Sequence, residues 1–242
     1  MLADKISILL PTSPIPHHPS THILDEVIES IRVHFPDNEL FLMIDGVRGQ
    51  VEHRRADYEE YKRRIIWKCQ QEWRNVLPVV FEEYTQQSGM TRKCLEMVKT
   101  PLVFFVEHDA PIDNTMPTDW AAIAATLESG EANMVRMMYW KQIIPEHEYL
   151  MLEHVVCNGA PFVKTIQYSG WPHLARVDWL KNMLGRHFDE TPKMLEANLY
   201  GPVVGAPWEH YKVMIYYPEE NAQRFYHRNG RVLNGVKDPC EW

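Results

Sequence analysis

Short runs that are almost entirely hydrophobic recur through the first half of the sequence. Three of them cover residues 6–10, 40–44 and 102–106, and they consist mainly of leucine, β-branched and aromatic residues. Runs of this length and composition predict strands that are buried on both faces of a sheet. Between the first two runs, hydrophobic positions within residues 23–31 recur at the spacing of a helix.

The alternation of strands and helices continues to about residue 140. We expect surface helices within residues 48–75, a short strand at 79–81, a helical segment at 90–99, a helix at 119–127 and a strand at 133–139. Strands that alternate with helices predict a parallel sheet that is covered by helices on both faces and joined by right-handed crossovers.

The pattern changes after residue 140. Two strand-like segments, 149–156 and 162–168, flank Asn158-Gly159, a dipeptide typical of a tight hairpin turn. After them we expect a helix at 172–183, a second helical stretch at 189–200 and a strand at 211–217. The predicted fold class is therefore α/β, with a mostly parallel sheet and an added antiparallel segment in the C-terminal half. Because no repeat or linker interrupts the pattern, we expect residues 1–242 to form one domain.

Charge and cysteine content narrow the classes of partner and compartment. The formal net charge of -8 argues against a non-specific polyanion binder, and it disfavours a nucleic-acid acceptor without excluding one. The four cysteines are widely spaced and form no C-x-x-C pair, which argues against a zinc site and indicates a reducing compartment. No apolar stretch approaches the length of a membrane span. We therefore expect a soluble, cytoplasmic protein.

Acidic residues follow two of the predicted strands. Glu107-His108-Asp109 come directly after the run at 102–106, and Asp45 follows the run at 40–44. In open α/β sheets, ligands bind beyond the carboxyl ends of the strands, and carboxylates there suit a divalent cation and the phosphates that it carries. The alternative is a strand whose polar end meets water. Neither a P-loop nor a dinucleotide-binding glycine fingerprint is present.

The segment from Gly89 to Asp109 resembles the central signature of GT-A-type glycosyltransferases of the family-2-like group. In that signature a glycine and an arginine, here Gly89 and Arg92, precede a helix, a hydrophobic strand and an acidic D-x-D motif. Here the motif reads Glu107-His108-Asp109, with glutamate in place of the first aspartate. The resemblance implies a GT-A-like fold with a nucleotide-binding half at 1–110 and an acceptor-binding and catalytic half at 111–242. It also implies transfer of a sugar from a nucleotide-diphosphate sugar, UDP-linked, to an acceptor hydroxyl with inversion.

The same resemblance assigns the donor and metal sites. It implies nucleotide-sugar contacts for Pro11, Thr12, Asp45, Arg92, Glu107, His108 and Trp171. It makes Asp109 and His227 ligands of Mn²⁺ (or Mg²⁺), with Glu107 acting through a bound water. Taken alone, Asp45-Gly46 is also typical of a turn, Trp171 of a core residue and His227 of a surface histidine.

An inverting displacement needs a base for the acceptor hydroxyl, and a positioned carboxylate is the usual choice. The segment that contains Glu196 resembles the region that carries this base in the relatives, although Ala197 replaces its second acidic residue. We predict Glu196 as the base, with Asp189 and Glu209 as reserves.

Two other functions remain open at this point. One is a non-catalytic module that binds a nucleotide sugar or glycan on the same fold. The other is a sugar nucleotidylyltransferase, which normally has a glycine-rich loop after its first strand, whereas residues 11–16 here contain three prolines. For the transferase, the partners would be a nucleotide-diphosphate sugar donor and a glycan, protein or small-molecule acceptor.

Overall fold

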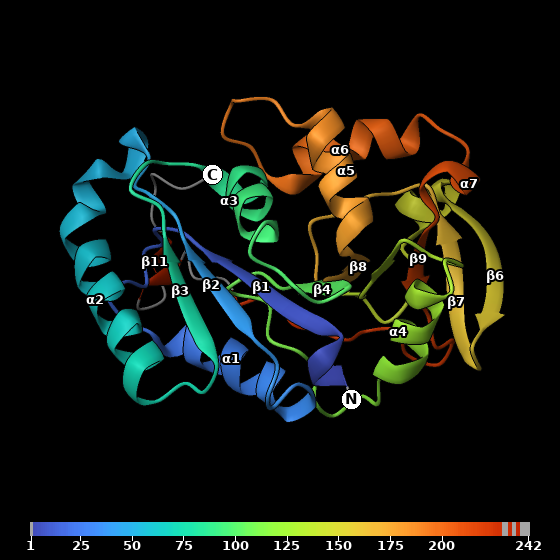
Figure 1. The fold of residues 1–242 in the computed structure, drawn as a ribbon, viewed down its shortest axis with the longest axis horizontal. Helices are drawn as coiled ribbons and strands as arrows, with labels where there is room; N and C mark the ends of the chain where they lie inside the picture. Colours follow the sequence, from blue (N-terminus) through green and yellow to red (C-terminus); the bar gives the residue numbers. More distant parts are fainter. Residues whose placement is uncertain (1, 229–231, 234–235, 238–242) are drawn as a thin grey trace.

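The computed structural model of the protein describes residues 2–228, 232–233 and 236–237. Nine strands form one sheet in the order β3-β2-β1-β4-β8-β5-β9-β7-β6 (Figure 1). The four strands that come first in the chain pair in parallel: β1 (Ile6–Thr12), β2 (Leu40–Ile44), β3 (Val76–Val80) and β4 (Leu102–Phe105). The helices between them are α1 (His22–His34), α2 (Arg55–Gln71) and α3 (Gln86–Leu95).

The second half of the chain adds strands of both directions. Its strands are β5 (Met134–Arg136), β6 (Met151–Cys157), β7 (Ala160–Thr165), β8 (His173–Arg176) and β9 (Val213–Tyr216). β8 is antiparallel to β4 and β5, and β7 is antiparallel to β9 and β6. β5 and β9 pair in parallel, so they run in the direction of β1–β4. The predicted α/β class, with an antiparallel addition in the C-terminal half, is confirmed.

Helices cover both faces of this sheet. α4 (Trp120–Glu128) lies on the same side as α1, whereas α5 (Val177–His187) and α6 (Leu195–Val204) lie on the side of α3 (Figure 1). The short helices are η1 (Leu2–Asp4), η2 (Gly49–Arg54), η3 (Pro145–Leu150) and α7 (Trp208–Tyr211). A small antiparallel pair, β10 (Val232–Leu233) with β11 (Val236–Lys237), follows near the C-terminus.

The uninterrupted hydrophobic runs are explained by this two-sided covering. In β2, Leu40, Leu42 and Ile44 belong to the core cluster on the side of α1, while Phe41 and Met43 belong to the cluster on the side of α3. Because successive side chains of a strand point to opposite faces, a strand with helices on both sides needs apolar residues at every position.

Two expected elements are corrected by the structure. The helix expected at 172–183 is wrong in its first part, because residues 173–176 form β8 in the middle of the sheet. β8 joins α5 without a loop, and its apolar residues fit a helical spacing as well as a strand, so the hydrophobic pattern could not separate the two. The helical stretch expected at 189–200 begins only at Leu195, because a loop in which the carboxylate of Asp189 accepts a hydrogen bond from the Thr191 amide precedes it.

The hairpin predicted around Asn158-Gly159 is confirmed as the β6–β7 turn. Both residues have positive φ angles, 50° and 84°, which is the backbone conformation that a two-residue hairpin turn favours.

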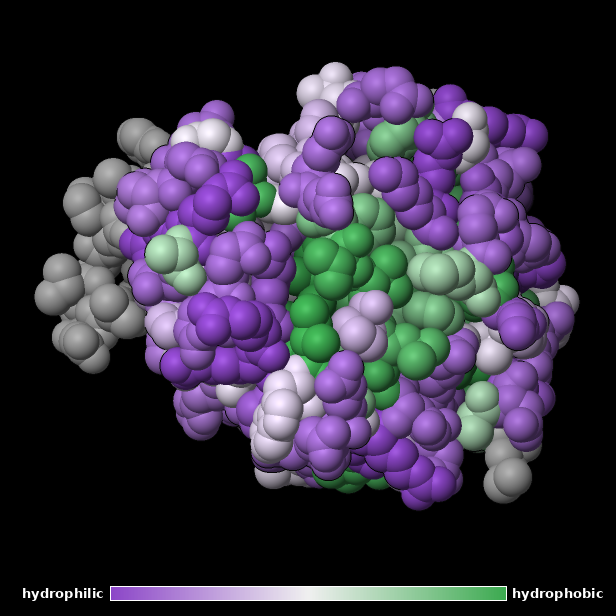
Figure 2. All heavy atoms as spheres, turned by 60° about the vertical axis from the view of Figure 1, so that its left-hand side comes forward, coloured by the Kyte–Doolittle hydropathy of each residue, from purple (hydrophilic) through white to green (hydrophobic). Residues whose placement is uncertain are grey.

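At the opposite edge of the sheet, β3 pairs with β2 alone. Figure 2 turns this side of the molecule forward and shows a hydrophobic area bordered by hydrophilic surface. β3 exposes Leu77 and Val80 by 43% and 46%. Pro78 in the middle of β3 has no amide hydrogen, which limits pairing of this edge with a further strand. The described helices include none with the length and apolar character of a membrane span.

Candidate active site

The candidate residues gather at the carboxyl ends of the parallel strands. Thr12 ends β1, Asp45 follows β2, and Glu107 and Asp109 follow β4. Arg136 ends β5 at the same edge, since β5 runs in the direction of these strands. The topology therefore brings together residues that lie far apart in the sequence. We call the row of polar residues at the carboxyl ends of the parallel strands the polar edge.

Asp109 and His227 come together across this edge. Asp109 Oδ2 lies 3.3 Å from His227 Nε2, and the Arg228 amide donates a 2.7 Å hydrogen bond to the Asp109 carbonyl. Burial alone would raise the pKa of Asp109, but the charge of His108 and the hydrogen bond and charge of His227 hold it below its usual value. The carboxylate is therefore the form present at neutral pH.

Metal binding by this pair stays a prediction. Within the described residues, no three His, Cys, Asp or Glu side chains form a cluster that could hold a metal ion. Two protein ligands fit an ion that takes its remaining ligands from substrate phosphates and water. A carboxylate with an imidazole suits Mn²⁺, because imidazole is a weaker ligand for the strictly oxygen-preferring Mg²⁺.

Glu107 lies partly buried beside this pair. Burial, and next the charge of Asp109, raise the pKa of Glu107 to about 7. Gln87, at the start of α3, donates a 2.7 Å hydrogen bond from Nε2 to Glu107 Oε1. Gln87 was not among the predicted site residues, because an amide at the start of a helix has no distinctive sequence pattern.

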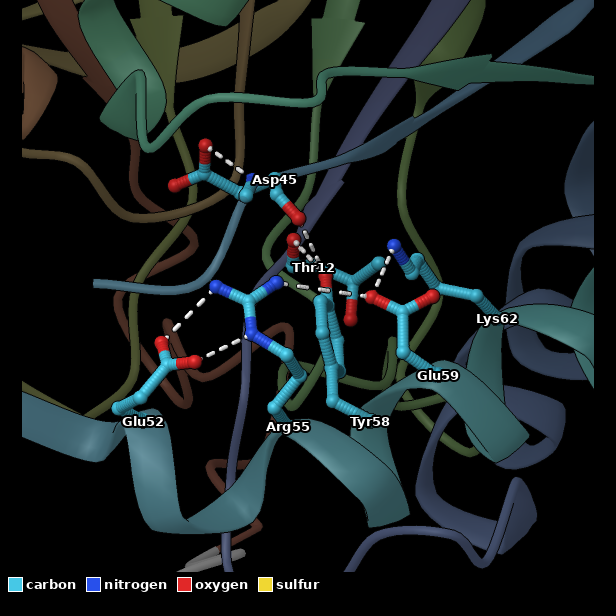
Figure 3. A network of polar contacts seen from close by, with 8 residues as sticks. Thr12, Asp45, Glu52, Arg55, Tyr58, Glu59 and Lys62 are labelled. Carbon is cyan, nitrogen blue, oxygen red and sulfur yellow. Dashed lines mark hydrogen bonds and ion pairs between the residues drawn. The ribbon is translucent and has the colours of Figure 1, made fainter. Parts of the chain in front are cut away.

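The ends of β1 and β2 carry an aromatic and hydroxyl network (Figure 3). Tyr58, from α2, donates a 2.9 Å hydrogen bond to the carbonyl of Asp45. The hydroxyls of Tyr61 and Thr12 lie 3.0 Å apart, and the ring of His18 stacks on Tyr61 with centroids 3.7 Å apart. Pro11, the residue before Thr12, is buried in β1, and the ring nitrogen Nε2 of His108 is buried without a hydrogen-bond partner among the described residues. The predicted nucleoside residues thus lie beside one another on the polar edge.

The carboxylate of Asp45 has three backbone partners in this structure. It accepts hydrogen bonds of 2.9, 2.8 and 3.0 Å from the amides of Gly46, Thr85 and Gln86. Burial raises the pKa of Asp45, and the three hydrogen bonds oppose this rise. Asp45 therefore fastens the end of β2 to the start of α3, which carries Gln87, and a nucleoside contact by Asp45 stays a prediction.

Arg92 points to a different neighbour. It is exposed on α3, with its guanidinium 4.9 Å from the centroid of the Phe188 ring and 3.9 Å from the Glu190 carboxylate. Both partners belong to the loop between α5 and α6, and Arg92 forms no ion pair with Glu107 or Asp109. Its contact with a diphosphate remains a prediction.

A pocket of about 270 Å³ opens beside the acidic residues, lined by Arg136, His147, Tyr149, Leu150, Gln167, Ser169, Trp171, Glu196 and Tyr200. Glu196, near the start of α6, accepts a 3.4 Å hydrogen bond at Oε2 from the Gly170 amide. The negative charge of Glu196 contributes to the raised pKa of Glu107, so the pocket is electrostatically coupled to Glu107.

The three candidate bases differ in position. Glu196 lines the pocket. Asp189 lies in the exposed α5–α6 loop, where its carboxylate pairs with Lys193, and Glu209 is exposed on α7. Asp189 and Glu209 are not part of the pocket wall.

Trp171 belongs to an aromatic cluster between the pocket and the Asp109–His227 pair. Its ring centroid lies 4.7 Å from that of Trp140, 5.7 Å from Phe225 and 5.9 Å from Tyr139. Tyr139 in turn lies 6.5 Å from the ring of His227. The cluster thus connects the two parts of the site.

Arg136 is the site residue that the sequence reasoning missed. It is buried at the end of β5 and lines the pocket. The expected strand at 133–139 placed this arginine inside a strand, whereas β5 ends at residue 136. The rule that ligands bind beyond strand ends would have selected Arg136 if the strand had been given its true end.

Comparison with solved structures shows a GT-A-like fold. Two chains of TarS 1–349 from S. aureus, one in complex with UDP-GlcNAc, are similar with TM-scores of 0.55 and 0.53 at 15% and 16% identity. The match covers 93% of this chain in both cases but only 58% and 60% of the TarS chains, so this chain spans about three fifths of their length.

A second kind of neighbour has the same fold. The 4-diphosphocytidyl-2C-methyl-D-erythritol synthase from Anaerococcus prevotii DSM 20548 is similar with a TM-score of 0.54 at 11% identity, over 92% of both chains. No protein-family profile and no curated protein sequence matches the chain. At these identities the similarity shows the fold alone, and the predicted likeness to the family-2 group stays a prediction.

Proposed function

We propose that this protein is a glycosyltransferase that moves a sugar from a nucleotide-diphosphate sugar, UDP-linked, to an acceptor hydroxyl on a glycan, protein or small molecule. The observation that carries the proposal is the contact between Asp109 and His227 at the end of β4, beside the pocket lined by Glu196. These two parts correspond to the two demands of glycosyl transfer: stabilisation of a leaving diphosphate and activation of a hydroxyl. The TarS chain that was solved with UDP-GlcNAc supports the choice of a UDP-linked donor.

In this proposal Asp109 and His227 would hold Mn²⁺ or Mg²⁺, and Glu107 would act through a water molecule. When bound, such an ion neutralises negative charge that develops on the diphosphate. Gln87 keeps Glu107 in place beside Asp109 through its 2.7 Å hydrogen bond. The charges of His108 and His227 keep Asp109 ionised for this role.

Glu196 would accept the proton of the acceptor hydroxyl as the hydroxyl attacks the anomeric carbon. A single displacement from the face opposite the leaving group gives a product of inverted configuration. The Trp171 ring offers an apolar surface on which a sugar ring can stack. The ends of β1 and β2, with Pro11, Thr12 and Asp45, would receive the nucleoside, together with His108 and Arg92.

A calorimetric titration of UDP, CDP and GDP, each with and without Mn²⁺, tests this function before the acceptor is known. We expect UDP to bind tightly only when the ion is present. Hydrolysis of UDP-GlcNAc in the presence of Mn²⁺ then separates an enzyme from a non-catalytic binding module, since a module would show none. Absence of metal-dependent nucleotide binding would contradict the proposal.

The second candidate is a sugar nucleotidylyltransferase. It is favoured by the match to the Anaerococcus synthase over 92% of both chains. The three prolines at residues 11–16 disfavour it, because they replace the glycine-rich triphosphate loop expected after the first strand. Release of pyrophosphate from CTP or UTP with a sugar phosphate would support this function over glycosyl transfer.

We also propose a cytoplasmic location. Cys69, Cys94 and Cys157 are free thiols, and burial raises the pKa of each, so they are unreactive side chains suited to a reducing compartment. Fractionation of the cells that produce the protein checks this location.

A further inference from the structure

Arg136 is a buried cation whose hydrogen-bonding capacity is mostly unused. Its side chain is only 3% exposed. Nη2 donates a 3.0 Å hydrogen bond to Gln167 Oε1, whereas Nε is buried without a partner and Nη1 has no partner among the described residues. Its guanidinium forms no ion pair within 4.0 Å with a carboxylate of the described residues, and the charge of Glu196 acts on it from a greater distance. Burial of an unpaired charge is costly, so this arrangement needs a physical explanation.

The surroundings of Arg136 are those of a binding pocket rather than of a packed core. The guanidinium lies in the wall of the 270 Å³ pocket, with Gln167 and Ser169 beside it and Glu196 also in the wall. The Trp171 ring centroid lies 5.5 Å from the guanidinium carbon, so the cation is supported by an aromatic ring. The pocket is slightly smaller than the usual range of about 300–1,000 Å³ for small-molecule sites, which suits a ligand portion of about one sugar ring.

We propose that Arg136 is the recognition residue for an anionic group, a carboxylate or a phosphate, on the sugar that enters this pocket. Arginine suits this role because its planar fork of N–H donors matches the oxygens of such groups. The anion would supply the missing hydrogen-bond partners of Nη1 and a negative charge in direct contact with the guanidinium, which Glu196 provides only at longer range. This inference rests on the proposed glycosyltransferase function and adds the chemical class of the substrate.

The position of Arg136 separates this anion from the nucleotide diphosphate. β5 is two strand positions away from β4, which corresponds to about 10 Å at the usual strand spacing. The diphosphate belongs with Asp109 and His227 at the end of β4. The anion at Arg136 therefore belongs either to the transferred sugar, as in a uronic acid donor, or to the acceptor, as in a sugar phosphate.

Calorimetric titrations distinguish these two sources. The first arm compares UDP-glucuronate with UDP-glucose in the presence of Mn²⁺. The second arm compares glucose 6-phosphate and glucuronate with glucose, each titrated into protein that is already saturated with UDP and Mn²⁺. We expect the charged sugar to bind at least 10-fold more tightly than the neutral one in one of the arms, and that arm identifies the source of the anion.

The variants Arg136→Gln and Arg136→Lys test the role of the guanidinium. Arg136→Gln should abolish the preference for the charged sugar while leaving the binding of UDP with Mn²⁺ within twofold of wild type. Arg136→Lys keeps a cation without the planar fork and should retain a smaller preference, and it carries the test if the glutamine variant does not fold. Arg176→Gln is the matched control, since Arg176 lies at the other end of the neighbouring strand β8 and pairs with Asp178.

Two results would overturn the inference. One is equal binding of charged and neutral sugars in both arms by a wild-type protein that binds UDP normally. The other is an undiminished preference in the Arg136 variants. Failure of the proposed function itself would look different, because UDP and Mn²⁺ would then not bind in either arm.

Discussion

At the scale of single residues, Asp109 and His227 carry the proposed metal site. Asp109→Asn keeps the shape of the side chain but removes the charge that attracts a cation. We expect this variant to lose metal-dependent binding of UDP and to keep its fold, as measured by calorimetry and circular dichroism.

His227→Ala should bind UDP only at a higher Mn²⁺ concentration, because one of the two protein ligands is missing. An unchanged Mn²⁺ titration in both variants would contradict the metal assignment.

Glu196 is the residue on which the proposed transfer step depends. Glu196→Gln should bind UDP and Mn²⁺ normally, because those contacts lie at the ends of β1, β2 and β4. Turnover with an acceptor should fall by roughly 10²–10⁴, the usual contribution of a general base. NMR of the product gives its anomeric configuration, and inversion is expected. Near-normal turnover would move the role to Asp189 or Glu209, and retention would remove the need for a base.

At the scale of elements, the packing of the end of β2 against the segment that precedes α3 positions the site. A Cβ at Gly46 would lie 2.3 Å from the backbone carbon of Glu83, so this segment approaches β2 too closely for any side chain. Gly46→Ala should lower the free energy of unfolding by about 1–3 kcal/mol, as overpacking does, and should weaken UDP binding through displacement of Gln87. Gly49→Ala is the control, because nothing lies within 4 Å of a Cβ there. Equal urea midpoints for the two variants would contradict the tight contact.

The elements also show where sequence reasoning succeeds and fails. Strands that are buried on both faces, such as β1, β2 and β4, were located from their hydrophobic runs because helices on both sides leave few polar positions. β8 was missed because its four residues join α5 without a turn. That error had a consequence for the site. β8 lies between β4 and β5, so its position determines where Arg136 lies along the polar edge.

At the scale of the whole molecule, the α/β class with its mostly parallel sheet was predictable because it follows from the order of strands and helices, whereas the GT-A-like fold was implied by the family resemblance. The polar edge was predicted in part from the sequence, because Glu107 and Asp109 come directly after a hydrophobic run. His227 and Asp109 are separated by more than a hundred residues of the chain. Only the family resemblance predicted that the two side chains would lie together. The place of Arg136 in the site depends on the exact end of β5, and that of Gln87 depends on packing between elements. The hydrophobic pattern contains neither kind of information.

The stability of the whole fold should depend on His173, a histidine buried where β8 crosses the middle of the sheet. Burial lowers the pKa of His173 to about 4, and its Nδ1 lies 2.7 Å from the Trp171 carbonyl. The unfolded chain binds this proton with a pKa of about 6.5. Below that pH the unfolded state therefore takes up a proton that the folded state refuses, and the folded state loses stability until the pH reaches about 4.

Other buried groups act in the opposite direction, so the wild-type profile alone does not isolate His173. Glu107, whose pKa is raised to about 7, gains a proton more readily in the folded state and stabilises it on acidification. The comparison of wild type with His173→Gln removes this contribution. We expect the variant to be less stable than wild type at pH 7.5, and this deficit to shrink by about 1 kcal/mol at pH 5.5, because the wild type alone then carries the cost of a neutral buried imidazole. Urea unfolding at the two pH values measures the change, with His22→Gln as an exposed control. A deficit that stays constant between pH 7.5 and 5.5 would mean that His173 is protonated as easily in the fold as in the unfolded chain.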